Sequence, residues 1–345
     1  MNMLNLFVSL TIITLINLFC CINGKCIVKK TYYPAEYEKM WRNKIIYETD
    51  ESKAWLHGCQ NLKNNETLLT QWIEFSSNRQ AGQNPDPTEL IKSGVLSYFH
   101  TQEICDGVVV HDKNIPIEPL IGFLRHPFYH CLKGRKTEVE DKDYIIVTRE
   151  DEIFPVSKVK SNSSTSYLFD VGANLYDGWQ ITNKWFIKGS MSTKWFVDAY
   201  NISNIGFDRI LCWEANHMEP KKIYHHIPRK VLGKISYFNI PVTAEKESEK
   251  NPLTIMKDVA TTEDFVVIKI DIDAPLIELP LIHEIINDPV LRELIDELYF
   301  EHHVHGSPMV HLGWGGQMSV NETLISSYEI FSKLRELGVR AHSWV

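Results

Sequence analysis

The C-terminal half of the chain alternates short apolar runs with amphipathic stretches, a pattern typical of α/β proteins. The clearest run, residues 265–270, is almost continuously apolar, which indicates a central strand buried on both faces. Helical spacing is clearest over 322–337, which ends at Gly338, a residue suited to a helix C-cap. The expected strands are 167–171, 207–213, 234–238, 265–270, 297–300 and 338–344, and the expected helices are 190–202, 217–231, 279–295 and 322–337.

The region before residue 160 has a different texture. It is rich in Tyr, Trp and polar residues, with turn signals such as 83–87 and little regular periodicity. Short helices are expected at 35–47, 66–77 and 87–98, and a strand at 144–147. A polar run over 160–166 is typical of a linker or loop. We therefore expect an N-terminal mixed extension over 25–160 and, over 161–345, a doubly wound, mostly parallel sheet with helices on both faces.

The first 24 residues are set apart by their lack of charge. Residues 3–21 are uncharged and mostly Leu, Ile, Phe and Val, and Ile22-Asn23-Gly24 is a workable small-residue cleavage site. The run also approaches the roughly 20 residues that span a bilayer. We therefore expect entry into the secretory pathway, with either a cleaved signal and a lumenal or secreted chain, or an uncleaved N-terminal membrane anchor.

Two further features fit that route. Tripeptides that can accept N-linked glycans begin at Asn65, Asn162, Asn201 and Asn321. In an oxidising lumen, disulfides are expected among Cys26, Cys59, Cys105 and Cys131. Cys212 lies in an apolar run and is expected to be a buried thiol.

The charge balance excludes one class of partner. The 345 residues include 44 Asp and Glu against 36 Lys and Arg, for a formal net charge of -8. Binding of nucleic-acid phosphates needs clustered basic side chains, and no basic run here is longer than two residues. We expect no nucleic-acid partner.

Acidic residues follow four of the expected strands. The motifs are Asp170-Val171-Gly172-Ala173-Asn174, Glu214-Ala215-Asn216, Asp271-Ile272-Asp273 and Glu301-His302-His303. Because ligands of parallel sheets collect at the carboxyl ends of the strands, these side chains predict a site for a small polar ligand. A glycine after the first strand lets a ligand approach the backbone, and an acid after the second can accept both hydroxyls of a ribose.

In order and spacing these motifs resemble a class I S-adenosylmethionine-dependent methyltransferase, most closely the FkbM-like group. The resemblance covers roughly half the chain and is carried by residues 169–174, 213–216, 267–273 and 300–303. It implies a Rossmann-like sheet of the methyltransferase type, S-adenosyl-L-methionine as cofactor and methylation of an oxygen. For a chain in the secretory pathway, the acceptor would be a glycan or another small molecule that carries a hydroxyl.

The resemblance also implies roles for individual residues. Asp170, Gly172 and Asn174 would line the methionine part of the cofactor. Glu214 would hold the ribose, with Ala215 beside the adenine. Asp271 would stand near the reactive sulfonium. A nearby carboxylate or imidazole can take the proton from an acceptor hydroxyl, and the catalytic candidates are Asp271, Asp273, Glu301 and His302.

Two alternatives remain open. Asp271-Ile272-Asp273 is also the D-x-D pattern that holds a divalent metal and a sugar nucleotide in many glycosyltransferases. Alternatively, the chain is a non-catalytic lumenal or secreted protein that retains the fold, since Asp271-Ile272-Asp273-Ala274-Pro275 stands where the family usually has D-V-E-G. Four histidines allow a metal cluster with Asp271 and Asp273, but the sequence favours polar lining of a pocket and no bound metal. These histidines are His302, His303, His305 and His311.

Overall fold

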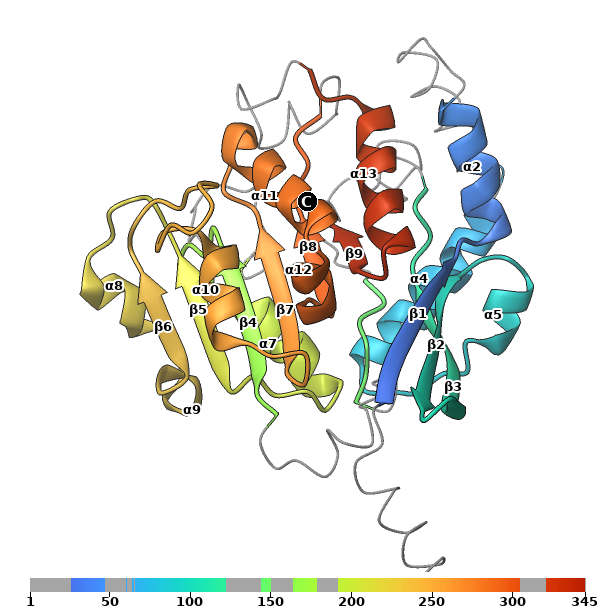
Figure 1. The fold of residues 1–345 in the computed structure, drawn as a ribbon, viewed down its shortest axis with the longest axis horizontal. Coiled ribbons are helices and arrows are strands. Elements are labelled where there is room, and N and C mark those ends of the chain that lie inside the picture. Colours follow the sequence, from blue (N-terminus) through green and yellow to red (C-terminus); the bar gives the residue numbers. More distant parts are fainter. Residues whose placement is uncertain are drawn as a thin grey trace, which may run out of the picture.

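The protein is an α/β protein with one parallel and one antiparallel sheet, seen in a computed structural model (Figure 1). The expected fold class is confirmed at this level. The expected signal segment, residues 1–24, lies outside the part of the chain that the structure describes. The described residues are 26–46, 66–121, 144–149, 164–178, 192–304 and 321–344, with Gln60 and Asn64.

The six-stranded sheet is parallel throughout. Its order is β6-β5-β4-β7-β8-β9, so the direction in which strands are added reverses between β4 and β7. Such a reversal opens a crevice at the carboxyl ends of the two central strands. The strands are β4 (Ser166–Val171), β5 (Arg209–Trp213), β6 (Ile235–Phe238), β7 (Phe265–Ile270), β8 (Glu297–Phe300) and β9 (Arg340–Ser343).

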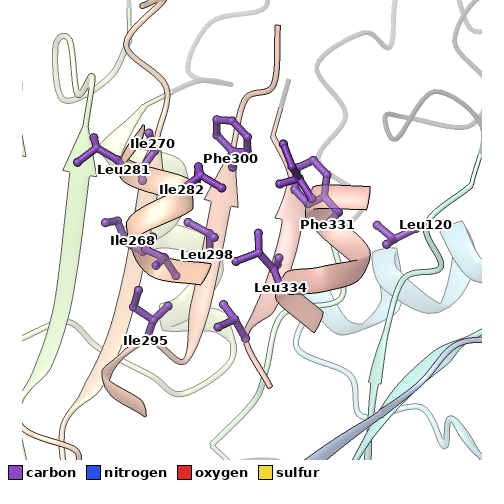
Figure 2. Close-up of a cluster of buried hydrophobic side chains, with 14 of the residues drawn as sticks. Leu120, Ile268, Ile270, Leu281, Ile282, Ile295, Leu298, Phe300, Phe331 and Leu334 are labelled. Carbon is purple, nitrogen blue, oxygen red and sulfur yellow. The ribbon is translucent and has the colours of Figure 1, made fainter. Parts of the chain in front are cut away.

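Helices cover both faces of this sheet. In Figure 1, α10 to α13 lie in front of it and α7 lies behind. The front core joins β7, β8, α11 and α13, and Leu120 of the N-terminal region also packs into it (Figure 2). The helices are α7 (Thr193–Ile202), α8 (Pro220–His225), α9 (Arg229–Leu232), α10 (Pro252–Val259), α11 (Pro275–Asn287), α12 (Pro289–Leu294) and α13 (Leu324–Glu336).

The three-stranded antiparallel sheet has the order β1-β2-β3 and lies beside α2, α4 and α5 (Figure 1). A disulfide between Cys26 and Cys105 joins the paired ends of β1 and β2. It confirms a disulfide among the N-terminal cysteines; Cys59 and Cys131 lie outside the described residues. The elements are β1 (Cys26–Tyr33), α2 (Glu36–Ile46), α4 (Glu66–Gln80), α5 (Thr88–Lys92), β2 (Ser97–Cys105) and β3 (Val108–Ile117).

The N-terminal elements differ most from expectation. The helix expected over 87–98 stops at Lys92, and the chain enters β2 at Ser97 after Gly94, which has φ 74°. The expected strand at 144–147 is not a strand, although Ile145, Ile146 and Val147 are buried. Burial of that segment against the sheet, rather than strand pairing, accounts for its apolar residues.

Prolines divide two of the expected helices. The stretch 217–231 forms the short helices α8 and α9, with Pro228 as the N-cap of α9. The stretch 279–295 begins earlier, at Pro275, and is interrupted at Asp288, whose side chain caps α12 by accepting from Val290 N at 2.8 Å. The residue before a proline disfavours helical conformation, which explains the breaks before Pro228 and Pro289. Pro280, in contrast, lies inside α11.

The structure also bears on the expected membrane segments, glycan acceptor sites and free cysteine. No helix in the described parts of the chain is long and apolar enough to cross a membrane. Asn201 and Asn321 are exposed, whereas Asn65 and Asn162 lie outside the described residues. Cys212 is a buried free thiol, as expected.

Candidate functional site

The strand ends of β4 and β7 meet at Gly172. This residue has φ 89°, and a Cβ built on it would lie 1.6 Å from the carbonyl oxygen of Asp271. From the sequence, we expected this glycine to let a ligand approach the backbone. In the structure, the neighbouring strand end already requires a glycine here, so its presence carries no information about a ligand.

Asp170 lies behind this turn and is fully buried. Its carboxylate accepts hydrogen bonds from Thr193 Oγ1 at 2.7 Å and from Lys269 Nζ at 3.3 Å. Both oxygens therefore have protein partners, and the side chain holds the turn rather than facing open space.

Lys269 is the central cation of the site. Its ammonium also donates to Gly172 O at 2.9 Å and lies 3.1 Å from Asp271 Oδ2. Burial lowers the pKa of Lys269, but Asp271 and Asp170 outweigh burial and raise it, so the lysine is charged. The sequence interpretation assigned it no role, although a lone lysine inside an apolar strand was the available signal.

Glu214 follows β5 and is held in one position. Its backbone N donates to Phe238 O at 3.1 Å, and its own Oε1 accepts from Asn216 N at 2.7 Å. Asn239 Nδ2 donates to Glu214 O at 2.8 Å. Oε2 has no hydrogen-bond partner among the described residues, and the residue is only 8% exposed, while its neighbour Ala215 is exposed. The chain thus presents one fixed carboxylate oxygen at this strand end.

Asn174 lies at the same edge, in the turn after β4. It has φ 52°, and its Oδ1 accepts from Leu175 N at 2.7 Å, so its side chain shapes its own turn. The hydroxyl of Tyr237, from β6, donates to Asn174 O at 2.7 Å. Burial and the negative charge of Glu214 raise the pKa of Tyr237, which keeps that hydroxyl a donor.

Asp271 and Glu301 share a side-chain hydrogen bond at the ends of β7 and β8. Asp271 Oδ2 accepts from Trp344 Nε1 at 2.9 Å as well as from Lys269. Burial raises the pKa of Asp271, but Lys269 and hydrogen bonds outweigh it and hold the pKa at about 2. Burial and repulsion from Asp271 raise the pKa of Glu301 to about 7. Asp271 is thus a permanent anion and a poor proton acceptor.

Asp273, Glu301 and His303 converge where the site reaches solvent at Asp273, which we call the mouth of the site. His303 Nε2 lies 2.9 Å from Glu301 Oε2 and 3.6 Å from Asp273 Oδ1. His303 and Glu301 are buried, whereas the Asp273 side chain is 54% exposed. Glu278, in the first turn of α11, is also buried and accepts from Ile272 N at 2.8 Å. Sequence reasoning missed Glu278 because one helical turn separates it from the strand-end motif.

His302 does not join this cluster. Its ring stacks on Phe300 at 5.3 Å, and its Nε2 lies 3.3 Å from Glu322 Oε2. Burial lowers the pKa of His302, and Glu322 only partly opposes this. Of the four catalytic candidates, the structure therefore brings together Asp271, Asp273 and Glu301. His305 and His311 lie outside the described residues.

A separate cavity of about 500 Å³ lies against α7. None of the strand-end residues described above lines it. Its lining residues include Gln80, Asp177, Lys194, Asp198 and Ile202.

Comparison with known proteins identifies no relative of this chain. No family model matches the chain, and it matches no curated protein and no solved structure. The class that fold and site define is an α/β protein with a polar, partly buried cluster at the carboxyl edge of a parallel sheet.

Proposed function

We propose that the chain is an S-adenosyl-L-methionine-dependent methyltransferase with its nucleoside pocket at the ends of β4 and β5. Numbered along the chain, the strands of the parallel sheet have the order 3-2-1-4-5-6. This is the order of Rossmann-like nucleotide-binding proteins, in which ligands occupy the crevice where the order reverses. The resemblance of the strand-end motifs to FkbM-like methyltransferases points to the same edge.

The observation that carries the proposal is the free oxygen of Glu214. Asn216 and Asn239 fix the position of this residue, and Oε2 remains without a partner in the described residues. Glu214 is only 8% exposed, and an anionic carboxylate oxygen held in place there can accept a charge-assisted hydrogen bond from a hydroxyl donor. A ribose supplies such hydroxyls.

The other residues fit the rest of such a cofactor. The exposed Ala215 leaves room for a flat base beside Glu214. The turn from Gly172 to Asn174, supported from behind by Asp170 and Lys269, would border the methionine part. When bound, this cofactor supplies an electrophilic methyl group.

The acceptor side would be the cluster at the mouth of the site. Asp273 is its exposed member, and Glu301 and His303 stand behind it. A carboxylate or imidazole in this place can take the proton of an acceptor hydroxyl while the chain holds the acceptor in position. Asp271 would contribute a fixed negative charge rather than proton transfer.

The acceptor we propose is a glycan or another hydroxyl compound in the secretory pathway. The FkbM-like resemblance supports oxygen methylation. The Cys26–Cys105 disulfide suits an oxidising compartment, and the exposed acceptor residues Asn201 and Asn321 suit a glycoprotein.

The D-x-D interpretation receives less support. Asp271 is committed to Lys269 and Trp344, whereas Asp273 faces His303. The two aspartates therefore do not face one ion together, as a sugar-nucleotide enzyme of that type would need.

Calorimetric titration of the purified full chain with S-adenosylhomocysteine tests the proposal. We expect Glu214→Ala to weaken binding about tenfold to a hundredfold, because a charge-assisted hydrogen bond contributes about 1.5–3 kcal/mol. Glu219→Ala, at an exposed site five residues away, is the matched control and should bind as the wild type does. If the wild type gives no binding heat at high micromolar S-adenosylhomocysteine, the methyltransferase proposal fails. The alternative of a non-catalytic protein that retains the fold then takes its place.

A further inference from the structure

Three potential metal ligands meet at the mouth of the site. His303 Nε2, Glu301 Oε2 and one carboxylate oxygen of Asp273 all lie within 4.8 Å of one another. Two of the separations are 2.9 Å and 3.6 Å. Ligands bound at about 2.1 Å from one octahedral ion are about 3 Å apart, so these atoms are already close to the spacing that such an ion requires.

We propose that Asp273, Glu301 and His303 bind one divalent cation. β7 leads into Asp273 and β8 leads into the other two residues, so two neighbouring parallel strands fix the positions of the ligands. Glu301 and His303 are buried, and Asp273 lies at the surface. An ion held there would keep coordination positions open toward solvent or a substrate oxygen.

Glu278 provides an independent reason to expect a cation. It is 1% exposed, and its Oε2 has no hydrogen-bond partner among the described residues. Its carboxyl lies within electrostatic reach of His303, Glu301 and Asp271. A carboxylate in so buried a residue is stabilised by a nearby positive charge, and a cation in the triad would supply one.

The nearby lysine does not supply that charge. Lys269 is bound by Asp170, Asp271 and the carbonyl of Gly172. Neither Asp273 nor Glu278 has a Lys or Arg ion pair among the described residues. The ion pairs of Lys269 are therefore with Asp170 and Asp271, behind the three proposed ligands.

The ligand set favours a first-row transition ion over Mg²⁺ or Ca²⁺. One imidazole nitrogen with carboxylate oxygens suits Mn²⁺ or Zn²⁺, whereas Mg²⁺ and Ca²⁺ prefer oxygen alone. We take Mn²⁺ as the probe, because the site combines more oxygens than nitrogens and lacks thiolates. The cation site rests on this geometry and does not depend on the proposed methyl transfer. If both hold, the cation would lower the pKa of an acceptor hydroxyl.

The test is titration of the full chain with MnCl₂, with free Mn²⁺ followed by electron paramagnetic resonance and heat by calorimetry. We expect one Mn²⁺ per chain. Asp273→Asn should weaken binding at least tenfold, since even residues that merely support metal ligands contribute about 10–100-fold. Asparagine tolerates the left-handed backbone of Asp273, which has φ 55°, so the fold should be unaffected.

Asp106→Asn is the matched control. Asp106 is also an exposed aspartate with positive φ, 52°, but lies in the β2–β3 turn. The Asp106→Asn variant should bind Mn²⁺ with the affinity of the wild type. Glu301→Gln should remove binding, and a circular dichroism spectrum like that of the wild type would show that this buried variant has folded. Displacement of Mn²⁺ by Zn²⁺ at the same stoichiometry would also support the site.

Two results would overturn the proposal: no bound Mn²⁺ or Zn²⁺ at millimolar metal, or equal affinity in Asp273→Asn and Asp106→Asn. These titrations contain no nucleoside, and the S-adenosylhomocysteine titration can be run in chelator. Failure of the metal site and failure of the proposed cofactor pocket are therefore distinguishable.

Discussion

At Gly172 the absence of a side chain is explained by the protein itself. The carbonyl of Asp271 occupies the position of a Cβ, and the residue has a left-handed φ of 89°. A bulky substitution here would distort both strand ends, so reduced ligand binding by such a variant would not identify a ligand contact. Glu214, which has a free oxygen and no comparable backbone constraint, is the appropriate residue for that purpose.

A pair of glycine variants separates these effects. Gly172→Ala should destabilise the protein by about 2–5 kcal/mol, the sum of left-handed strain and overpacking. Gly107→Ala has similar strain, with φ 80°, but no atom within 4 Å of the new Cβ, so it should cost only about 1–2 kcal/mol. Urea denaturation measures both. Equal losses would mean that the contact with Asp271 O is not the constraint.

Lys269 illustrates the cost of removing a buried charge. Lys269→Met would leave Asp170 and Asp271 without their cation, and we expect a loss of about 3–5 kcal/mol in the free energy of unfolding. Lys257→Met is the control, because Lys257 is one-third exposed and its ion pairs with Glu284 and Asp288 contribute at most about 1 kcal/mol. A similar small loss for both variants, by urea denaturation, would contradict this role.

At the level of elements, the sequence predicted the strands of the parallel sheet well, because their apolar runs are nearly continuous. β7 matches its expected range, and β4 and β5 differ by one or two residues. The antiparallel sheet was missed. The buried face of β2 carries Ser97, Thr101 and Glu103 as well as Phe99, so the hydrophobic alternation that marks a half-buried strand is absent.

The site was predictable where it depends on strand ends and not where it depends on side-chain direction. Parallel pairing brings Asp271 and Glu301 to one edge, as expected. Sequence order could not show that His303 turns toward Glu301 while His302 turns toward Glu322. Nor could it show that Trp344, at the end of the chain, donates to Asp271.

On the scale of the whole molecule, a buried charged network joins the N-terminal region to the parallel sheet. His342 Nδ1 lies 2.7 Å from Glu118 Oε1, and its Nε2 lies 3.4 Å from Glu297 Oε1. Arg340 donates to Glu297 and also to the carbonyl of Pro116. Because these partners come from both regions, loss of the N-terminal extension would leave several buried charges unpaired. The rings of Tyr144 and Tyr299 also contact His342, while Arg335 pairs with Glu118 and Tyr200 donates to Glu297.

This network predicts a pH dependence. Burial lowers the pKa of His342, but Glu118 and Glu297 outweigh burial and raise the pKa above its ordinary 6.5. Charged His342 therefore stabilises the fold below pH 6.5, and this stabilisation is lost as the pH rises through the folded-state pKa. Despite burial, His342 and Arg340 lower the pKa of Glu297 to about 2, so its contribution is present above pH 4.5 and lost in acid.

Unfolding free energies at pH 6 and pH 8.5 test this. The wild type should lose more stability over that interval than His342→Gln, which cannot gain or lose a proton there. His225→Gln, at an exposed histidine on α8, should keep the wild-type slope. Equal slopes for the wild type and His342→Gln would show that His342 does not titrate with folding.

The central claim is a nucleoside pocket at the carboxyl ends of β4 and β5. A crystal structure of the full chain with S-adenosylhomocysteine tests it most directly. The account predicts ribose hydroxyls within hydrogen-bond distance of Glu214 Oε2 and the base beside Ala215. A ligand bound in the cavity against α7, or crystals without bound ligand despite saturating concentration, would contradict it.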